Sequence, residues 1–114
     1  MTQDAAQDMA TGPVRLELAD GVATLVLDNP ANLNAASAAM MGALDRRLAQ
    51  LEVMEGLRVV ILSGAGRAFC AGGDLIEFRA ALAAGGTQLL DTLLYNQTVI
   101  DRIEALPVPV IGVA

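Results

Sequence analysis

The chain has 114 residues, 54% of them hydrophobic and 3% aromatic, which allows one domain or part of one with a core of Ala, Leu and Val. Its formal net charge is -6, all seven cations are Arg, and it has no His, which argues against a nucleic-acid-binding surface. The single Cys cannot form an internal disulfide, which favours a reducing, cytoplasmic compartment.

The first twelve residues are small and polar, contain two Asp and carry no basic residue. They lack the regions of a signal peptide, and we expect residues 1–12 to form a disordered lead-in to a domain over residues 13–114. No apolar run approaches the ~18 residues of a transmembrane helix, so no membrane association is expected.

The first elements are predicted to form a hairpin. Val14 to Leu18 alternates apolar and polar residues, whereas Val22 to Leu27 is more uniformly apolar, which is typical of a strand buried on both faces. Asp20-Gly21 between them is a strong hairpin turn pair. Asp28-Asn29-Pro30 ends the second strand, and residues 32–35 are predicted to be a loop.

A helix is predicted from the N-cap Ser37 to about Met54, with Gly56 as its C-terminal stop. Its apolar positions fall at helical spacing and are Met40, Met41, Leu44, Leu48 and Leu51. Its solvent side is expected to carry Asp45, Arg46, Arg47, Gln50 and Glu52. A third strand over residues 58–63 follows.

Two further helices and a strand complete the chain. Asp74 can cap a short helix to about Ala83, Gly85-Gly86 breaks it, and residues 87–105 form a longer helix. Residues 108–113 are predicted to be another buried strand. Because two strands follow helices, the order indicates an α/β fold with parallel crossovers. A bare apolar strand is seldom left exposed, so we expect more chain after Ala114 in the intact protein.

The stretch Arg67-Ala68-Phe69-Cys70-Ala71-Gly72-Gly73-Asp74-Leu75 lies between the third strand and a helix. Small residues and paired glycines let a ligand approach the backbone and leave N–H groups free to point at it. Such a loop can stabilise an oxyanion without a catalytic side chain.

This stretch and four others, in the same order, resemble the N-terminal half of the enoyl-CoA hydratase/isomerase, or crotonase, superfamily. The others are Leu27-Asp28-Asn29-Pro30 with Asn32-Leu33-Asn34-Ala35, the amphipathic helix, Val59-Val60-Ile61-Leu62-Ser63-Gly64, and Ile103-Glu104-Ala105-Leu106-Pro107-Val108-Pro109-Val110-Ile111-Gly112. Each is weak alone, but together they cover nearly the whole chain from Val14 to Ala114.

The resemblance implies the N-terminal portion of a crotonase-like ββα spiral that assembles into homotrimers or hexamers and binds acyl-CoA thioesters. Two backbone N–H groups of such enzymes polarise the thioester carbonyl and stabilise an enolate. The second, and the two Glu of the hydratases, would lie beyond Ala114, so the 114-residue segment alone is expected to be inactive. Hydration of an enoyl-CoA is the default reaction, with double-bond isomerisation and β-hydroxyacyl-CoA hydrolysis as alternatives.

By resemblance, the backbone N–H of Cys70 is the first oxyanion donor. A nucleophilic Cys70 is a poor alternative, since the chain has no His to activate its thiol. The resemblance also assigns substrate contacts to Asn34, Ala35, Arg67, Ala68, Ala71, Gly72, Gly73, Asp74 and Leu75. Loop packing for Asn34 and Ala35, a solvated Arg67, and helix capping by Asp74 remain open as alternatives.

Outside this set, Glu77 and Asp91 are the nearest carboxylates, and each could act as acid or base only if buried beside the loop. Candidates for the acyl pocket are Phe78, Leu82, Leu94 and Tyr95, with core packing as the alternative. Coenzyme A is expected as part of the substrate, with no tightly bound cofactor and no metal. A rival class is a non-catalytic module that binds CoA or a partner strand along its last strand.

Overall fold

A computed structural model describes residues 12–66, 69–70 and 75–113 of the chain. Its four-stranded sheet has the order β1-β2-β3-β4. The strands are β1 (Val14–Ala19), β2 (Val22–Leu27), β3 (Val59–Gly64) and β4 (Val110–Val113). β1 pairs antiparallel with β2, and the β2–β3 and β3–β4 pairs are parallel. The predicted α/β fold with parallel crossovers is therefore confirmed. The expected lead-in falls almost entirely outside the described residues.

The hairpin turn between β1 and β2 follows from its two central residues. Asp20 and Gly21 have φ angles of 52° and 82°, and a two-residue turn of this kind needs positive φ at both positions. A side chain at Gly21 would also place its Cβ 2.8 Å from the carbonyl oxygen of Gly56. Glycine is thus required here by conformation and by space.

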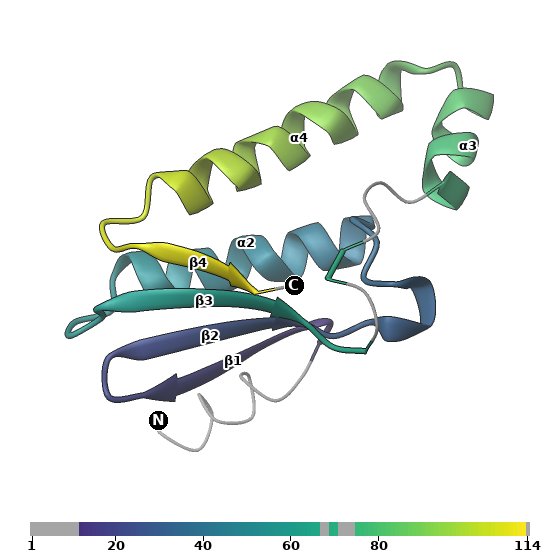
Figure 1. Cartoon of the computed structure of the whole chain (residues 1–114). Coiled ribbons are helices and arrows are strands. Elements are labelled where there is room, and N and C mark those ends of the chain that lie inside the picture. The colour runs from purple at the N-terminus through teal and green to yellow at the C-terminus, as the bar shows by residue number, and fades with distance from the viewer. Residues whose placement is uncertain (1–11, 67–68, 71–74, 114) are drawn as a thin grey trace.

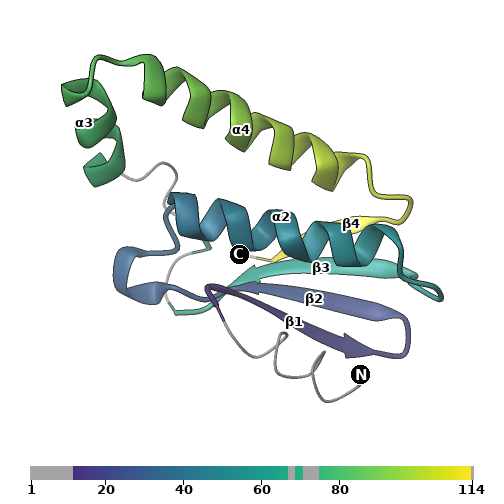
Figure 2. The same cartoon turned by 180° about the vertical axis from the view of Figure 1, so that it is seen from behind.

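The helical elements are η1, a short 3-10 turn (Pro30–Asn32), α2 (Ala38–Glu52), α3 (Leu75–Ala83) and α4 (Thr87–Glu104). Figures 1 and 2 show α2 lying across one face of the sheet. They also show α4 running beside α2 in the same direction, with α3 at the end of α4 farthest from β4. The helices therefore cover one face of the sheet in the described part of the chain.

The core lies between this face of the sheet and α2. Ser37 caps α2 as predicted, since its Oγ accepts a hydrogen bond from the Met40 N–H at 3.1 Å. The apolar stripe predicted for this helix is buried throughout. It packs with side chains of β1, β2 and β3 and with Val99 of α4 in a single cluster. Burial of this stripe, rather than helix propensity, accounts for most of the helix's stability.

Three details differ from the sequence predictions. β4 is not a buried strand: Ile111 and Val113 are about half exposed, because β4 is the edge strand and little of the described chain covers it. β2 is buried on both faces only in its second half. Arg47, placed on the solvent side of α2, is 4% exposed, since its Nε donates to the Val14 carbonyl at 2.9 Å.

Candidate functional site

The loop that follows β3 starts at the edge of the sheet where the parallel strands β2 and β3 both end. Its first residues are held by backbone contacts: the Ala65 N–H donates to the Leu27 carbonyl at 2.8 Å. Gly66 has a φ of 81°, and a Cβ there would lie 2.8 Å from the Cβ of Pro30. The loop therefore leaves the sheet in close contact with η1, at the edge where open α/β sheets commonly bind ligands.

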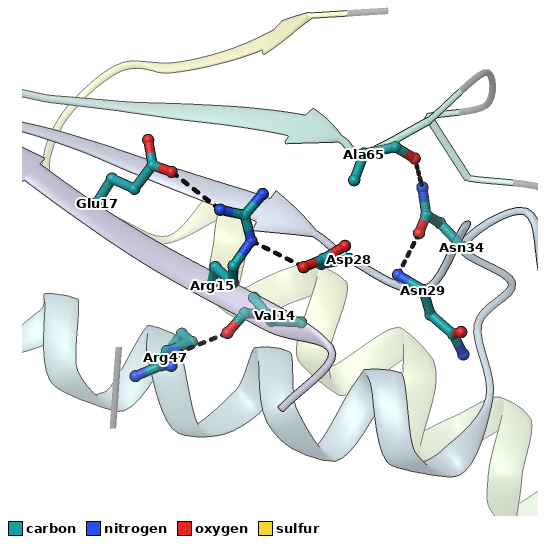
Figure 3. Close-up of polar contacts among 8 residues, drawn as sticks. All are labelled: Val14, Arg15, Glu17, Asp28, Asn29, Asn34, Arg47 and Ala65. Atoms are coloured by element: carbon teal, nitrogen blue, oxygen red, sulfur yellow. Dashed lines mark hydrogen bonds and ion pairs between the residues drawn. The ribbon is translucent and has the colours of Figure 1, made fainter. Parts of the chain in front are cut away.

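Asn34 ties these two segments together, as Figure 3 shows. Its side chain is fully buried, its Oδ1 accepts from the Asn29 N–H at 2.7 Å, and its Nδ2 donates to the Ala65 carbonyl at 3.0 Å. Asn34 has a left-handed φ of 56°, which Asn adopts more readily than most residues. Its side chain thus fixes the loop before α2 to the start of the loop after β3.

An apolar cavity of about 450 Å³ lies beside the described part of this loop. Cys70 is exposed and Phe69 is half-buried, and both line the cavity. The sheet and η1-to-α2 segment contribute Leu27, Ala36 and Leu62, α2 contributes Met40, Met41 and Leu44, and α4 contributes Leu93, Asn96 and Ile100. The residue predicted to supply the oxyanion donor therefore borders an apolar space of ligand size.

Only some of the other predicted substrate contacts lie among the described residues. Asn34 and Ala35 are both buried, and Leu75 is the first residue of α3. The remaining predicted residues, Arg67, Ala68, Ala71, Gly72, Gly73 and Asp74, lie outside the described residues. Their contacts with CoA stay predictions, and for Asn34 the loop-packing alternative accounts for its side-chain hydrogen bonds to Asn29 and Ala65.

The two candidate acid/base carboxylates, Glu77 and Asp91, are not part of the cavity lining. The Glu77 Oε1 accepts a hydrogen bond from the Ala38 N–H at 2.8 Å, so Glu77 satisfies a free donor at the start of α2. Asp91 is exposed on α4. Neither residue lines the cavity. The position of Glu77 connects α3, which directly follows the loop, to the N-terminus of α2.

The predicted lining of the acyl pocket differs from the cavity found here. Leu82, Leu94 and Tyr95 are exposed and do not line it, and α4 presents Leu93, Asn96 and Ile100 instead. The sequence alone could not tell which side of this helix faces α2. Phe78 lies in α3.

A polar group between α2 and α4, which we call the clasp, was not anticipated from the sequence; its residues are Asp45, Glu52, Tyr95 and Arg102. Arg102 pairs with Asp45 and, at 2.7 Å, with Glu52, and the Tyr95 hydroxyl donates to Asp45 at 3.1 Å. The hydrogen bond from Arg102 is the main cause that lowers the pKa of Glu52. Desolvation, followed by the hydrogen bond to Asp45, raises the pKa of Tyr95.

The described residues also bear on membrane spanning and metal binding. No helix among them is both long enough and apolar enough to cross a bilayer. Within the same residues, no three His, Cys, Asp or Glu side chains gather in a way that could hold a metal ion.

The hairpin, the crossover helices and the loop after β3 define an α/β unit of the crotonase type. The family model described as enoyl-CoA hydratase/isomerase matches residues 22–114, and the chain belongs to this family. The predicted fold, the N-terminal portion of a crotonase domain, is thereby confirmed.

Solved structures of other proteins show a similar fold over most of this chain. An enoyl-CoA hydratase from Bacillus anthracis is 34% identical, with a TM-score of 0.78, over 88% of this chain and 38% of that one. An enoyl-CoA hydratase/carnithine racemase from Magnetospirillum magneticum is 31% identical, with a TM-score of 0.81, over 90% and 38%. Human enoyl Coenzyme A hydratase domain-containing protein 3 is 29% identical, with a TM-score of 0.81, over 90% and 40%. The chain thus spans about two fifths of the length of these relatives.

Proposed function

We propose that this chain forms the thioester-binding part of an enzyme that hydrates an enoyl-CoA. The thioester carbonyl accepts a hydrogen bond from the Cys70 N–H, and the acyl chain enters the apolar cavity beside it. One observation carries the proposal: Cys70, in the loop that resembles the family's oxyanion loop, borders an apolar cavity of about 450 Å³. An acyl chain needs apolar surroundings of this kind, and its carbonyl needs a donor at their edge.

In the proposed reaction the oxygen of water bonds to the β-carbon of the enoyl group as one O–H bond of the water breaks. The π electrons of the double bond shift towards the thioester oxygen, and the α-carbon then takes up a proton. Negative charge accumulates on the thioester oxygen between these events. A fixed N–H donor stabilises this enolate oxygen more than the neutral carbonyl, which lowers the barrier. This chain therefore contributes a backbone N–H group to the chemistry, and the thiol of Cys70 takes no part in it.

Substitution of Cys70 tests this assignment. Cys70→Pro in the intact protein removes the N–H donor, and we expect kcat to fall by about 10²-fold or more. Cys70→Ala keeps the N–H and is the matched control, with kcat expected within about threefold of wild type. Steady-state hydration of crotonyl-CoA measures both, with circular dichroism to verify folding. A folded Cys70→Ala variant that loses activity would contradict the assignment, because the side chain would then matter.

The same binding arrangement serves two neighbouring reactions. Isomerisation of an enoyl-CoA and hydrolysis of a β-hydroxyacyl-CoA also place negative charge on the thioester oxygen. Product analysis with crotonyl-CoA, a 3-enoyl-CoA and a β-hydroxyacyl-CoA separates the three. Binding of all of them without turnover would instead favour the non-catalytic module.

The proposal also covers the assembly of the enzyme, its location and its cofactor. We expect homotrimers or hexamers in the cytoplasm, with coenzyme A bound as part of the substrate and no other cofactor. Light scattering of the purified protein, with and without acyl-CoA, measures the assembly.

A further inference from the structure

The clasp joins the same two helices that line the apolar cavity. Asp45 and Glu52 are seven residues apart on α2, as are Tyr95 and Arg102 on α4, and seven residues make almost two full helical turns. Each pair therefore lies along one side of its helix. Figure 1 shows that α2 and α4 run in the same direction. The contacts of the clasp therefore join the two helices over about two turns.

The cavity lies on the neighbouring side of each helix. Leu44, next to Asp45, lines it from α2, and Asn96, next to Tyr95, lines it from α4. Adjacent positions of a helix are turned by about 100° from each other, so the clasp and the cavity occupy different sides of the contact between the helices.

Val99 is the pivot between them. It is fully buried in the core, and on a helical projection it falls between the clasp residues of α4 and its cavity residues. Every other α4 side chain whose burial is described is half-buried or exposed. A narrow apolar contact lets a helix roll at little cost, whereas ion pairs to one side of it oppose rolling in one direction.

We propose that the clasp sets the width of the apolar cavity and thereby selects the length of acyl chain that the protein accepts. This inference rests on the proposed acyl-CoA binding. Without Arg102, α4 rolls about Val99 so that its clasp side moves away from α2 and its cavity side moves towards α2; the cavity narrows, and longer acyl chains no longer fit. Arg102 and Asp45 are positioning residues in this account, since neither lines the cavity.

A first experiment measures the width of the cavity without any CoA ligand. Cys70 lines the cavity and is exposed, so alkyl methanethiosulfonates can form a mixed disulfide with it and release methanesulfinate. The rates with a decyl and a methyl reagent are measured by mass spectrometry of the Cys70 peptide. In the intact Arg102→Gln variant we expect the decyl-to-methyl rate ratio to fall by about fivefold.

A second experiment measures acyl selectivity. Calorimetry gives the Kd values of saturated acyl-CoA thioesters with four and with twelve acyl carbons, which bind without being hydrated. In Arg102→Gln the affinity for the longer chain, relative to the shorter, is expected to fall by about fivefold, with free CoA binding unchanged. Arg102→Lys keeps the charge but not the fork that reaches both carboxylates, and should fall between wild type and Arg102→Gln.

Matched controls distinguish the effect of breaking the clasp from the effect of removing a positive charge. Arg79→Gln removes an exposed Arg of α3 and should leave both ratios at their wild-type values. Asp45→Asn combined with Arg102→Gln should shift the ratios no further than Arg102→Gln alone, because both changes break the same contact. If Arg102→Gln does not fold, Tyr95→Phe, which removes one hydroxyl of the clasp, carries the test with Arg102→Lys.

Each possible result of these experiments supports or contradicts the inference or the proposed function. A folded clasp variant with an unchanged thiosulfonate ratio overturns the inference, and so does a changed ratio without a change in acyl selectivity. If the wild-type protein binds neither thioester, the proposed function fails, and acyl selection by the clasp fails with it. The thiosulfonate ratio still shows in that case whether the clasp controls the cavity.

Discussion

Asn34 illustrates how one buried side chain positions the loop that carries Cys70. Its amide group accepts a hydrogen bond from the Asn29 N–H and donates one to the carbonyl of Ala65, which lies 31 residues further along the chain than Asn34. Ala65 is the first residue after β3. The start of the loop is therefore fixed from the η1 side, by a residue whose backbone is itself left-handed.

Replacement of Asn34 by Ala is expected to lower the free energy of unfolding by about 2 kcal/mol or more, because two buried backbone groups lose their partners. Urea unfolding measures the change. Asn32→Ala is the matched control: within the described chain its buried Oδ1 has no hydrogen-bond partner, so the loss should stay below about 1 kcal/mol. Equal losses in the two variants would show that Asn34 does not tie the loops together.

At the level of elements, α2 is the helix to which the others are attached. Ser37 and Glu77 both accept hydrogen bonds from its first N–H groups, and Glu77 comes from α3. Its C-terminal half pairs with α4 through the clasp. The cavity is thus bordered by α2 and α4, which polar contacts hold together beside an apolar core.

The clasp should make stability depend on pH in the acid range. Arg102 lowers the pKa of Glu52 below its ordinary value of 4.5 in the folded state. The stabilisation is therefore present above that value and is lost as the pH falls through the folded pKa. Urea unfolding from about pH 6 to about pH 3 should show wild type losing its advantage over Glu52→Gln. In an Arg102→Gln background the same comparison should show no such loss, and a persistent one would assign the effect to another group.

For the whole molecule, the notable feature is apolar surface on two elements. Leu90, Leu93, Leu94 and Ile100 of α4 and Ile111 and Val113 of β4 are all more than two fifths exposed. Apolar side chains left exposed on two elements are candidates for an interaction site. The chain also spans about two fifths of the length of its relatives. A complete active site is therefore expected to need more than these 114 residues.

A preparation of the 114-residue chain alone is accordingly expected to show no hydration of crotonyl-CoA above the uncatalysed rate. The assay follows the loss of enoyl absorbance, and the intact protein purified from its source serves as the control. The intact mass of that active protein is measured alongside. Turnover by a homogeneous 11.8 kDa chain would contradict the expectation.

The sequence by itself determined the strands, the turns and the helix ends, because these depend on neighbouring residues. Alternation predicted β1, Asp20-Gly21 predicted the hairpin, and Ser37 predicted the start of α2. The order of elements indicated parallel crossovers, and the motifs around Cys70 resembled the family that the comparisons identify.

The tertiary structure alone decided which residues meet across the chain. Arg47 is buried because the Val14 carbonyl, 33 residues away, accepts its hydrogen bond, whereas the adjacent Arg46 is exposed. Asp45 was expected on the solvent side of α2, and only the packing of the helices brings it to Arg102. β4 is apolar but exposed, since burial depends on what covers a strand. Local patterns cannot report such contacts, because they depend on how the elements pack.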